Sequence, residues 1–352
     1  MPEALSTHNL RTRLLQVLAV VVVVGLLLWL GPGLGSLRSR LSDASPGWLA
    51  AAAGLELLSA LSYVVVFRAV FCARMSWRLS YQIGMAEQAA NSLLPAGGAG
   101  GLALGVWALR RGGMSAEHIG RRTVAFFLLT SLANVWTLIA FAAAFAVGII
   151  GGDSAPWLTY SFAIAGVIGT VIVISLPAFA GSAKDRPALA ADAGRLRRAA
   201  RAARDALGSG VQDSILLLRQ RSPGVLTGSF GYMGFDIAAL GACFLAFGDA
   251  PSLGVLVVAY LIGQLGGLLP IPIGGIEGGL IATFALYNVP LATATVAVLA
   301  YRVLALWLPG LLGSIAFVQL RNTLSRQSAP ASLCAPLADP IPVAEIPAGA
   351  RS

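Results

Sequence analysis

Two interrupted apolar stretches decide the fold of this chain. Residues 266–279 read Gly-Gly-Leu-Leu-Pro-Ile-Pro-Ile-Gly-Gly-Ile-Glu-Gly-Gly, and residues 91–101 read Asn-Ser-Leu-Leu-Pro-Ala-Gly-Gly-Ala-Gly-Gly. Proline removes a backbone donor and glycine permits positive φ, so neither stretch can continue as one straight helix. The regions around them, about residues 80–110 and 253–287, are otherwise apolar. Each region is therefore predicted to form a helix, a break and a second helix.

The remainder of the chain is predicted to cross the lipid bilayer. Of its 352 residues, 57% are hydrophobic and 11% are charged, whereas soluble domains are about 25% charged. A soluble fold could not bury so much apolar surface. Apolar stretches of roughly the 20 residues that cross hydrocarbon predict an all-α polytopic membrane protein with six full spans, at about 14–35, 47–71, 123–150, 157–180, 224–248 and 292–318.

Positive charge sets the predicted topology. Lys and Arg outnumber Asp and Glu by 24 to 15, and in membrane proteins such an excess gathers in cytoplasmic loops. Nucleic-acid binding is a weaker interpretation. With a cytoplasmic N-terminus, the first broken element must be re-entrant if the arginines that flank it are all to lie inside: Arg74, Arg78, Arg110, Arg111, Arg121 and Arg122. The second broken element must then dip in from the outside, and the C-terminus is cytoplasmic.

The two breaks predict an inverted repeat inside one membrane domain, residues 1–325. Their Leu-Leu-Pro motifs begin at Leu93 and Leu268, 175 positions apart (268 − 93). Each lies within a series of span, span, re-entrant hairpin and span, over about residues 14–150 and 157–318. Because the two hairpins enter from opposite sides, the halves are related by an inverted repeat, as in many transporters.

One sizeable region outside the bilayer is expected. Residues 182–222 hold nine basic and four acidic residues, and this basic cytoplasmic loop contains apolar residues at helical spacing from Leu196 to Leu207. It is either a basic helix on the inner leaflet or a solvated loop whose arginines only fix topology. The tail, residues 326–352, is rich in Pro and Ala and is expected to be a disordered cytoplasmic segment.

A central cavity follows from opposed hairpins, because irregular backbone at membrane depth must be buried in protein or line a wet space. The second half-helices are predicted to start near Gly100 and Gly275, with free amides directed into that space. An anionic group such as a lipid phosphate suits such a site.

Ionisable side chains inside spans are costly, so they are candidate binding residues. Charge balance predicts that Arg302 neutralises Asp236 or Glu277 at similar depth. Structural alternatives stay open: Glu277 could complement its own helix dipole, Asp236 and Arg302 could lock two helices together, and Glu56 could bond a neighbouring helix. Asn91, like Glu87, Asn134 and Gln264, is either a ligand or polar glue between helices.

The sequence contains no catalytic motif. Gly97-Gly-Ala-Gly-Gly101 lacks the Lys-Ser/Thr of a phosphate-binding loop, and Cys72, Cys243 and Cys334 form no metal-binding pattern. We therefore expect no metal, no cofactor and no ATP site, so that turnover depends on gradients, on a partner protein or on downhill lipid exchange.

These residues resemble the lysylphosphatidylglycerol synthase transmembrane region family of flippase-like proteins. The resemblance is carried by Asn91-x3-Pro95-x-Gly97, by Pro270-x-Pro-x-Gly-Gly-Ile-Glu-Gly278, and by Tyr301-Arg302 followed by Pro309 and Gly313. It covers about residues 10–325 and implies a domain that moves lipids or lipid-linked head groups between leaflets, with Tyr301 beside Arg302 in the substrate site. About 34 residues follow the last span, so the aminoacyl transferase reaction of full synthases is not expected.

The first half departs from the family pattern. Many relatives have an acidic residue directly after the first break and an arginine three positions later, whereas this chain has Leu102 and Gly105. At an offset of 175 positions, Glu277 corresponds to Leu102 and Arg302 to Phe127.

Three functions are compatible with these features of the sequence. The leading one is a plasma-membrane lipid translocase whose substrate is an anionic phospholipid or a polyprenyl-phosphate-linked sugar. The second is an intramembrane lipid-modifying enzyme with Glu277 or Asp236 as general base. The third is an accessory subunit that organises a cell-envelope glycosyltransferase. Partners would then be membrane lipids, cell-envelope enzymes or a second copy of the chain.

Overall fold

The computed structural model describes residues 44–93, 99–151, 155–180, 195–268 and 274–326, which form helices and short turns without a strand. Five of these helices are long and apolar enough to cross a membrane: α3 (Pro46–Phe71), α6 (Ala116–Ala146), α7 (Pro156–Ala180), α9 (Pro223–Ala246) and α12 (Leu291–Arg326). They correspond to five of the six predicted spans, and the all-α polytopic class is confirmed. The predicted first span at 14–35 and the tail 326–352 lie outside the described residues, except for Arg326.

Both broken elements contain a pair of helices. The first consists of α4 (Trp77–Leu93) and α5 (Ala99–Arg111), and the second of α10 (Leu253–Gly263), a 3-10 turn η3 (Gln264–Leu268) and α11 (Gly275–Leu286). The breaks themselves, residues 94–98 and 269–273, lie outside the described residues. Gly274 caps α11 with φ of +101°, a left-handed conformation that glycine adopts without strain.

The first helix pair doubles back on itself. A Cβ at Gly101 of α5 would lie 2.6 Å from the backbone oxygen of Glu87 of α4, so the helices are in backbone contact there. Leu79 near the start of α4, Leu109 near the end of α5 and Ile119 near the start of α6 belong to one apolar cluster. The pair therefore begins and ends at the same end of the bundle, beside the C-terminus of α3.

The second helix pair doubles back from the other end. A Cβ at Gly263 of α10 would lie 2.7 Å from the Leu280 backbone of α11. Gly254, at the start of α10, packs against Phe145 near the end of α6. Tyr287, after the end of α11, bonds to Thr159 at the start of α7 across 2.6 Å. The two hairpins thus start from opposite ends of the helices between them.

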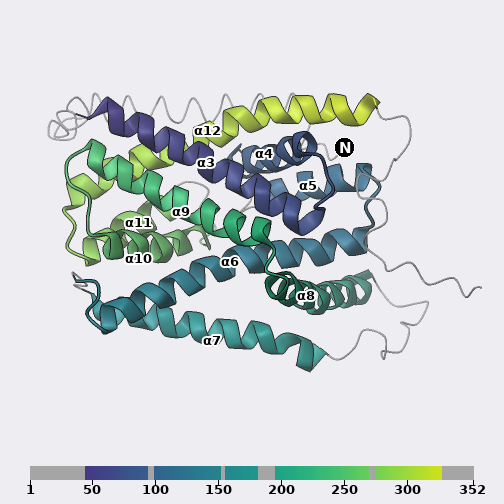
Figure 1. The fold of residues 1–352 in the computed structure, drawn as a ribbon, viewed down its shortest axis with the longest axis horizontal. Coiled ribbons are helices and arrows are strands. Elements are labelled where there is room, and N and C mark those ends of the chain that lie inside the picture. The colour runs from purple at the N-terminus through teal and green to yellow at the C-terminus, as the bar shows by residue number, and fades with distance from the viewer. Residues whose placement is uncertain (1–43, 94–98, 152–154, 181–194, 269–273, 327–352) are drawn as a thin grey trace, which may run out of the picture.

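The two halves meet along α3 and α9, which lie side by side in the centre of Figure 1. Ser45 donates its backbone N–H to Ala246 across 2.8 Å, so the start of α3 meets the end of α9. A Cβ at Gly228 would lie 2.6 Å from the Val66 backbone. We call this antiparallel α3–α9 contact the seam, because one helix belongs to each predicted repeat.

A long amphipathic helix, α8 (Arg195–Arg219), occupies most of the predicted basic loop. It packs on the start of α6, where Arg121 pairs with Asp213 across 2.9 Å and a Cβ at Gly210 would lie 2.6 Å from Val124. The helical interpretation of this loop is therefore correct, and α8 is anchored to the membrane helices. Its position on the inner leaflet stays a prediction.

Candidate functional site

A largely buried ion pair joins the second hairpin to the last span. Arg302 of α12 donates from Nε to Glu277 Oε1 across 2.9 Å. Glu277 Oε2 accepts the backbone N–H of Gly274 at 2.9 Å, so the same carboxylate caps α11. The sequence left open whether Glu277 serves its own helix or neutralises Arg302, and it does both. The side chains of Arg302 and Glu277 are 16% and 14% exposed, so the pair is mostly buried but still accessible from outside the protein.

Two tyrosines hold Asp236 of α9. Tyr301 of α12 donates to Asp236 Oδ1 across 2.7 Å, and Tyr260 of α10 donates to Oδ2. Both phenols are buried. The alternative in which Asp236 and Arg302 form the direct pair is therefore wrong, because Arg302 bonds to Glu277 and its charge acts on Asp236 from farther away.

Glu56 completes this group from α3. Its side chain is 5% exposed and lies near Asp236 across the seam, because Ser59, one turn along α3, donates to the backbone oxygen of Tyr232, one turn from Asp236 on α9, across 2.8 Å. Its Oε2 has no donor in the part of the chain that the structure describes. We call the resulting set the charged cluster: Glu56, Asp236, Tyr260, Glu277, Tyr301 and Arg302, from five helices.

The charged cluster is rich in acid. Three carboxyl groups face one guanidinium, and the guanidinium is already paired. Burying a charge without a partner costs several kcal/mol, about 3–5 when one member of a buried pair is removed. A proton, a cation or a mobile ligand could offset the excess, so the cluster has the composition of a binding site. Five of the predicted site residues, Glu56, Asp236, Glu277, Tyr301 and Arg302, meet here from four separate parts of the sequence.

The other predicted site residues lie in the hairpins. Asn91 near the end of α4 accepts the backbone N–H of Gly101 at 2.7 Å, so it ties the two arms of the first hairpin together. Gly100 lies in the first turn of α5, and Gly275 is the first residue of α11; both are buried. The predicted half-helix starts are thus correct to within a residue.

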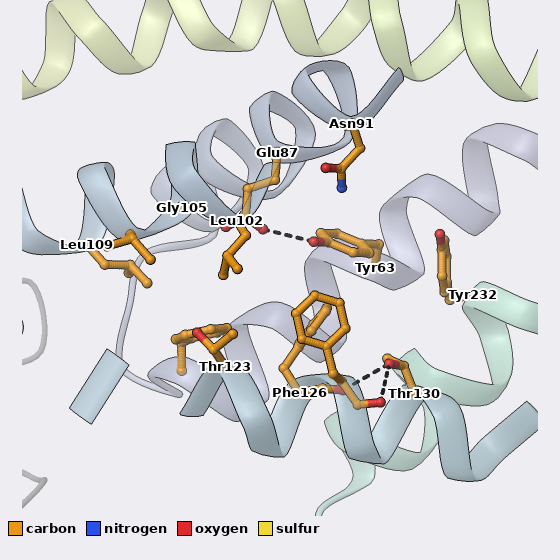
Figure 2. A pocket seen from close by; sticks show the side chains of 13 residues that line it. Tyr63, Glu87, Asn91, Leu102, Gly105, Leu109, Thr123, Phe126, Thr130 and Tyr232 are labelled. Atoms are coloured by element: carbon orange, nitrogen blue, oxygen red, sulfur yellow. Dashed lines mark hydrogen bonds between the residues drawn. The ribbon is translucent and has the colours of Figure 1, made fainter. Parts of the chain in front are cut away.

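A cavity of about 150 Å³ lies between α3, α4, α5, α6 and α9, and Figure 2 shows its lining. Glu87 of α4 faces it and accepts a hydrogen bond from Tyr63 of α3 across 2.9 Å. The other polar lining groups are Asn91, Thr123, Thr130 and Tyr232, and aromatic rings of α3 and α6 close its sides. Its size suits several water molecules and is below that of ordinary ligand pockets.

The sequence predicted a central cavity between the two hairpins, whereas this cavity is lined by the first hairpin and by no described residue of the second. Glu87 was interpreted from the sequence as a ligand or as polar glue. The sequence feature that marks the Glu87 position is Gly105 of α5, since a Cβ at Gly105 would overlap the Glu87 carboxyl group. A larger side chain at this position could not coexist with Glu87 in its present place. Gly105 therefore makes room for a carboxyl group.

Neither site has the composition of a metal centre. In the described ranges, His, Cys, Asp and Glu side chains form no group of three that could hold a metal ion.

Comparison with known proteins gives one match. The family model described as "Lysylphosphatidylglycerol synthase TM region" matches residues 16–313, which include both hairpins, the cavity and the whole charged cluster. No curated protein and no solved structure matches the chain significantly.

Proposed function

The chain belongs to the lysylphosphatidylglycerol synthase transmembrane region family, and on this premise we propose that it is an integral membrane lipid translocase. Its substrate would be an anionic phospholipid or a polyprenyl-phosphate-linked head group, which it moves between leaflets. The family and the five apolar helices support the broader statement that it is a multi-pass membrane protein of lipid or cell-envelope biosynthesis or transport. The plasma membrane and cytoplasmic termini are part of the proposal.

The observation that carries the proposal is the Glu277–Arg302 pair at the N-terminus of α11. Free backbone amides and the positive end of the helix dipole favour an anion at such a terminus. A guanidinium that holds a carboxylate can hold a phosphate with the same donors. A lipid phosphate would therefore replace Glu277 on Arg302, while the acyl or prenyl tails stay in the lipid.

The hairpin geometry supplies a route for the head group. One hairpin starts from each end of the bundle, so the proposal places both as re-entrant elements that meet near the bilayer midplane. Irregular backbone at this depth requires a protein-lined or wet environment. Rocking of one half against the other at the seam would expose the pair to each leaflet in turn, as in other inverted-repeat transporters. The partners would be the transported lipid and any cell-envelope enzyme that supplies it.

The test is lipid exchange in vesicles that contain the purified protein. Fluorescent lipids with phosphatidylglycerol, phosphatidic acid and phosphocholine head groups report movement when a membrane-impermeant reductant bleaches the outer leaflet. We expect faster exchange of the anionic lipids. Arg302→Ala should slow it about tenfold or more, the factor that corresponds to about 1.4 kcal/mol.

Two further variants sharpen this test. Glu277→Gln removes the competing carboxylate charge and should change the rate as well. Arg321→Ala is the matched control, because Arg321 is an exposed arginine on the same helix. Exchange that is no faster than in empty vesicles for every lipid, or that is unaffected by both Arg302→Ala and Glu277→Gln, would show that the chain is not a translocase of this kind.

A further inference from the structure

We propose that Glu56 and Asp236 form a proton-binding dyad at the seam, which couples head-group movement to a proton gradient. This inference rests on the proposed translocase function and names its energy source. The ligand is a proton, and the coupling device is the contact between one carboxyl group from each half of the chain.

The surroundings of Glu56 favour a protonated carboxyl group. The side chain is 5% exposed, and its Oε2 lacks a donor in the described part of the chain. Buried polar atoms are nearly always hydrogen-bonded. Asp236, its neighbour across the seam, already accepts two phenolic O–H groups. A proton on Glu56 would let its O–H donate to Asp236 and would complete the hydrogen bonding of both side chains.

Neighbouring charges do not replace this proton. Arg302 is the single cation near the dyad among the described residues, and it bonds to Glu277. The other titratable groups that face the dyad are neutral acids: Tyr232 and Cys243 of α9, Tyr260 of α10 and Tyr301 of α12.

Within the described ranges, α4 and α6 also bring no free cation to the dyad. Glu87 of α4 bonds to Tyr63, which is seven positions from Glu56, or about 10 Å along α3. The charged residues of α6 lie in its first turns, beside the far end of α3. Two ionised carboxylates in contact at low dielectric repel strongly, so a shared proton is the favoured arrangement.

The position of the dyad explains how one proton could move the halves. In the protonated state, the Glu56–Asp236 hydrogen bond holds α3 against α9. Release of the proton leaves two like charges facing each other across the seam, which favours a separated arrangement. In one cycle Glu56 would take a proton from one side of the membrane and release it, as the same proton, to the other. No bond other than this O–H bond forms or breaks.

The proton site can be tested without transport. Infrared spectroscopy of the purified protein at neutral pH detects the C=O stretch of a protonated carboxyl group, which shifts on exchange into heavy water. We expect Glu56→Gln to remove one such band, and Asp249→Asn, which changes an exposed carboxylate after α9, to leave it. Spectra of wild type and Glu56→Gln with the same protonated-carboxyl intensity would overturn the dyad.

Coupling is tested in the same vesicles with a pH step of one unit. If one proton moves with each lipid, a pH difference of one unit can maintain about a tenfold ratio between the tracer-lipid concentrations of the two leaflets. Wild type and Asp249→Asn should approach this ratio in the direction of the gradient, whereas Glu56→Gln should remain near an even distribution. The readout is a ratio, so it does not depend on the absolute rate of the variant.

The outcomes separate the two proposals. Exchange by the wild type that stays evenly distributed under a pH step would overturn proton coupling while the translocase stands. Accumulation that follows a sodium gradient and ignores the pH step would also overturn it. Absence of exchange for every lipid would overturn the translocase and the coupling together, and the infrared band would still decide whether the dyad binds a proton.

Discussion

Gly105→Ala provides a sharp test of the cavity, because one methyl group meets the Glu87 carboxylate directly. A Cβ at this position would overlap Glu87 Oε1 and approach its Cδ to 2.8 Å. The two helices are packed closely here, so the carboxyl group must turn away or α5 must move. Rotation of the carboxyl group breaks the Tyr63–Glu87 hydrogen bond of 2.9 Å, whereas movement of α5 disrupts its packing against α4.

The expected cost follows from three contributions. Leaving a buried hydrogen-bonding group without its partner costs about 1–3 kcal/mol, and overpacking adds about 1–3 kcal/mol. Alanine recovers about 1 kcal/mol of helix propensity. The free energy of unfolding should therefore fall by roughly 1–5 kcal/mol.

Titration of the purified protein in mild-detergent micelles with a denaturing detergent, followed by circular dichroism, measures this change. Gly54→Ala is the matched control, because nothing lies within 4 Å of a Cβ at that helical position; it should be neutral or slightly stabilising. Glu87→Ala combined with Gly105→Ala should cost less than the sum of the single changes, since the clash has gone. The reasoning fails if Gly105→Ala is as stable as Gly54→Ala, or if the two changes add.

Three further changes probe the contacts around the second hairpin. Gly263→Ala should destabilise the protein by about 1–3 kcal/mol through overpacking against α11, whereas Gly278→Ala, with open space around its Cβ, should not; equal detergent midpoints would contradict this. Thr159→Val removes a buried hydroxyl bond and should cost about 1–3 kcal/mol, and an unchanged midpoint would count against that bond. Arg302→Met should cost about 3–5 kcal/mol by stranding a buried carboxylate, and Glu277→Gln in the same chain should restore part of it; no recovery would mean that the pair is not the source of the loss.

Much of the fold was predictable because it follows from solvent and chain chemistry. Spans are fixed by length and apolarity, and five of the six have helices at the expected positions. The starts of α5 and α11 were marked by glycine runs that cannot continue the preceding helix. Arg110 and Arg121 indicated that α5 returns toward the end where α4 begins, which is where the apolar cluster around Leu109 and Ile119 lies.

The pairing of side chains was less predictable, because it depends on helix rotation and depth. Charge balance was compatible with a pair between Arg302 and either of two carboxylates. Arg302 pairs with Glu277 because of the way α11 faces α12. The two tyrosines on Asp236 also come from separate helices. Tyr301 was singled out only by its place beside Arg302 in a family motif, and no pattern marked Tyr260.

The predicted repeat allows the chemistry of the two halves to be compared position by position. At the offset of 175, Leu102 and Phe127 correspond to Glu277 and Arg302. Leu102 and Phe127 line one cavity, and their predicted counterparts form the ion pair.

On the predicted repeat, the first half has apolar side chains where the second half has the ion pair, and its buried carboxyl group is Glu87. A phosphate would be attracted by Arg302 in the second half, whereas the corresponding position of the first half holds the uncharged Phe127. If the head group binds at the second hairpin and moves past the seam, its contacts in the two halves cannot be equivalent. Substrate selectivity should therefore reside in the second half, and substitutions of Leu102 should alter the rate of exchange more than the choice of lipid.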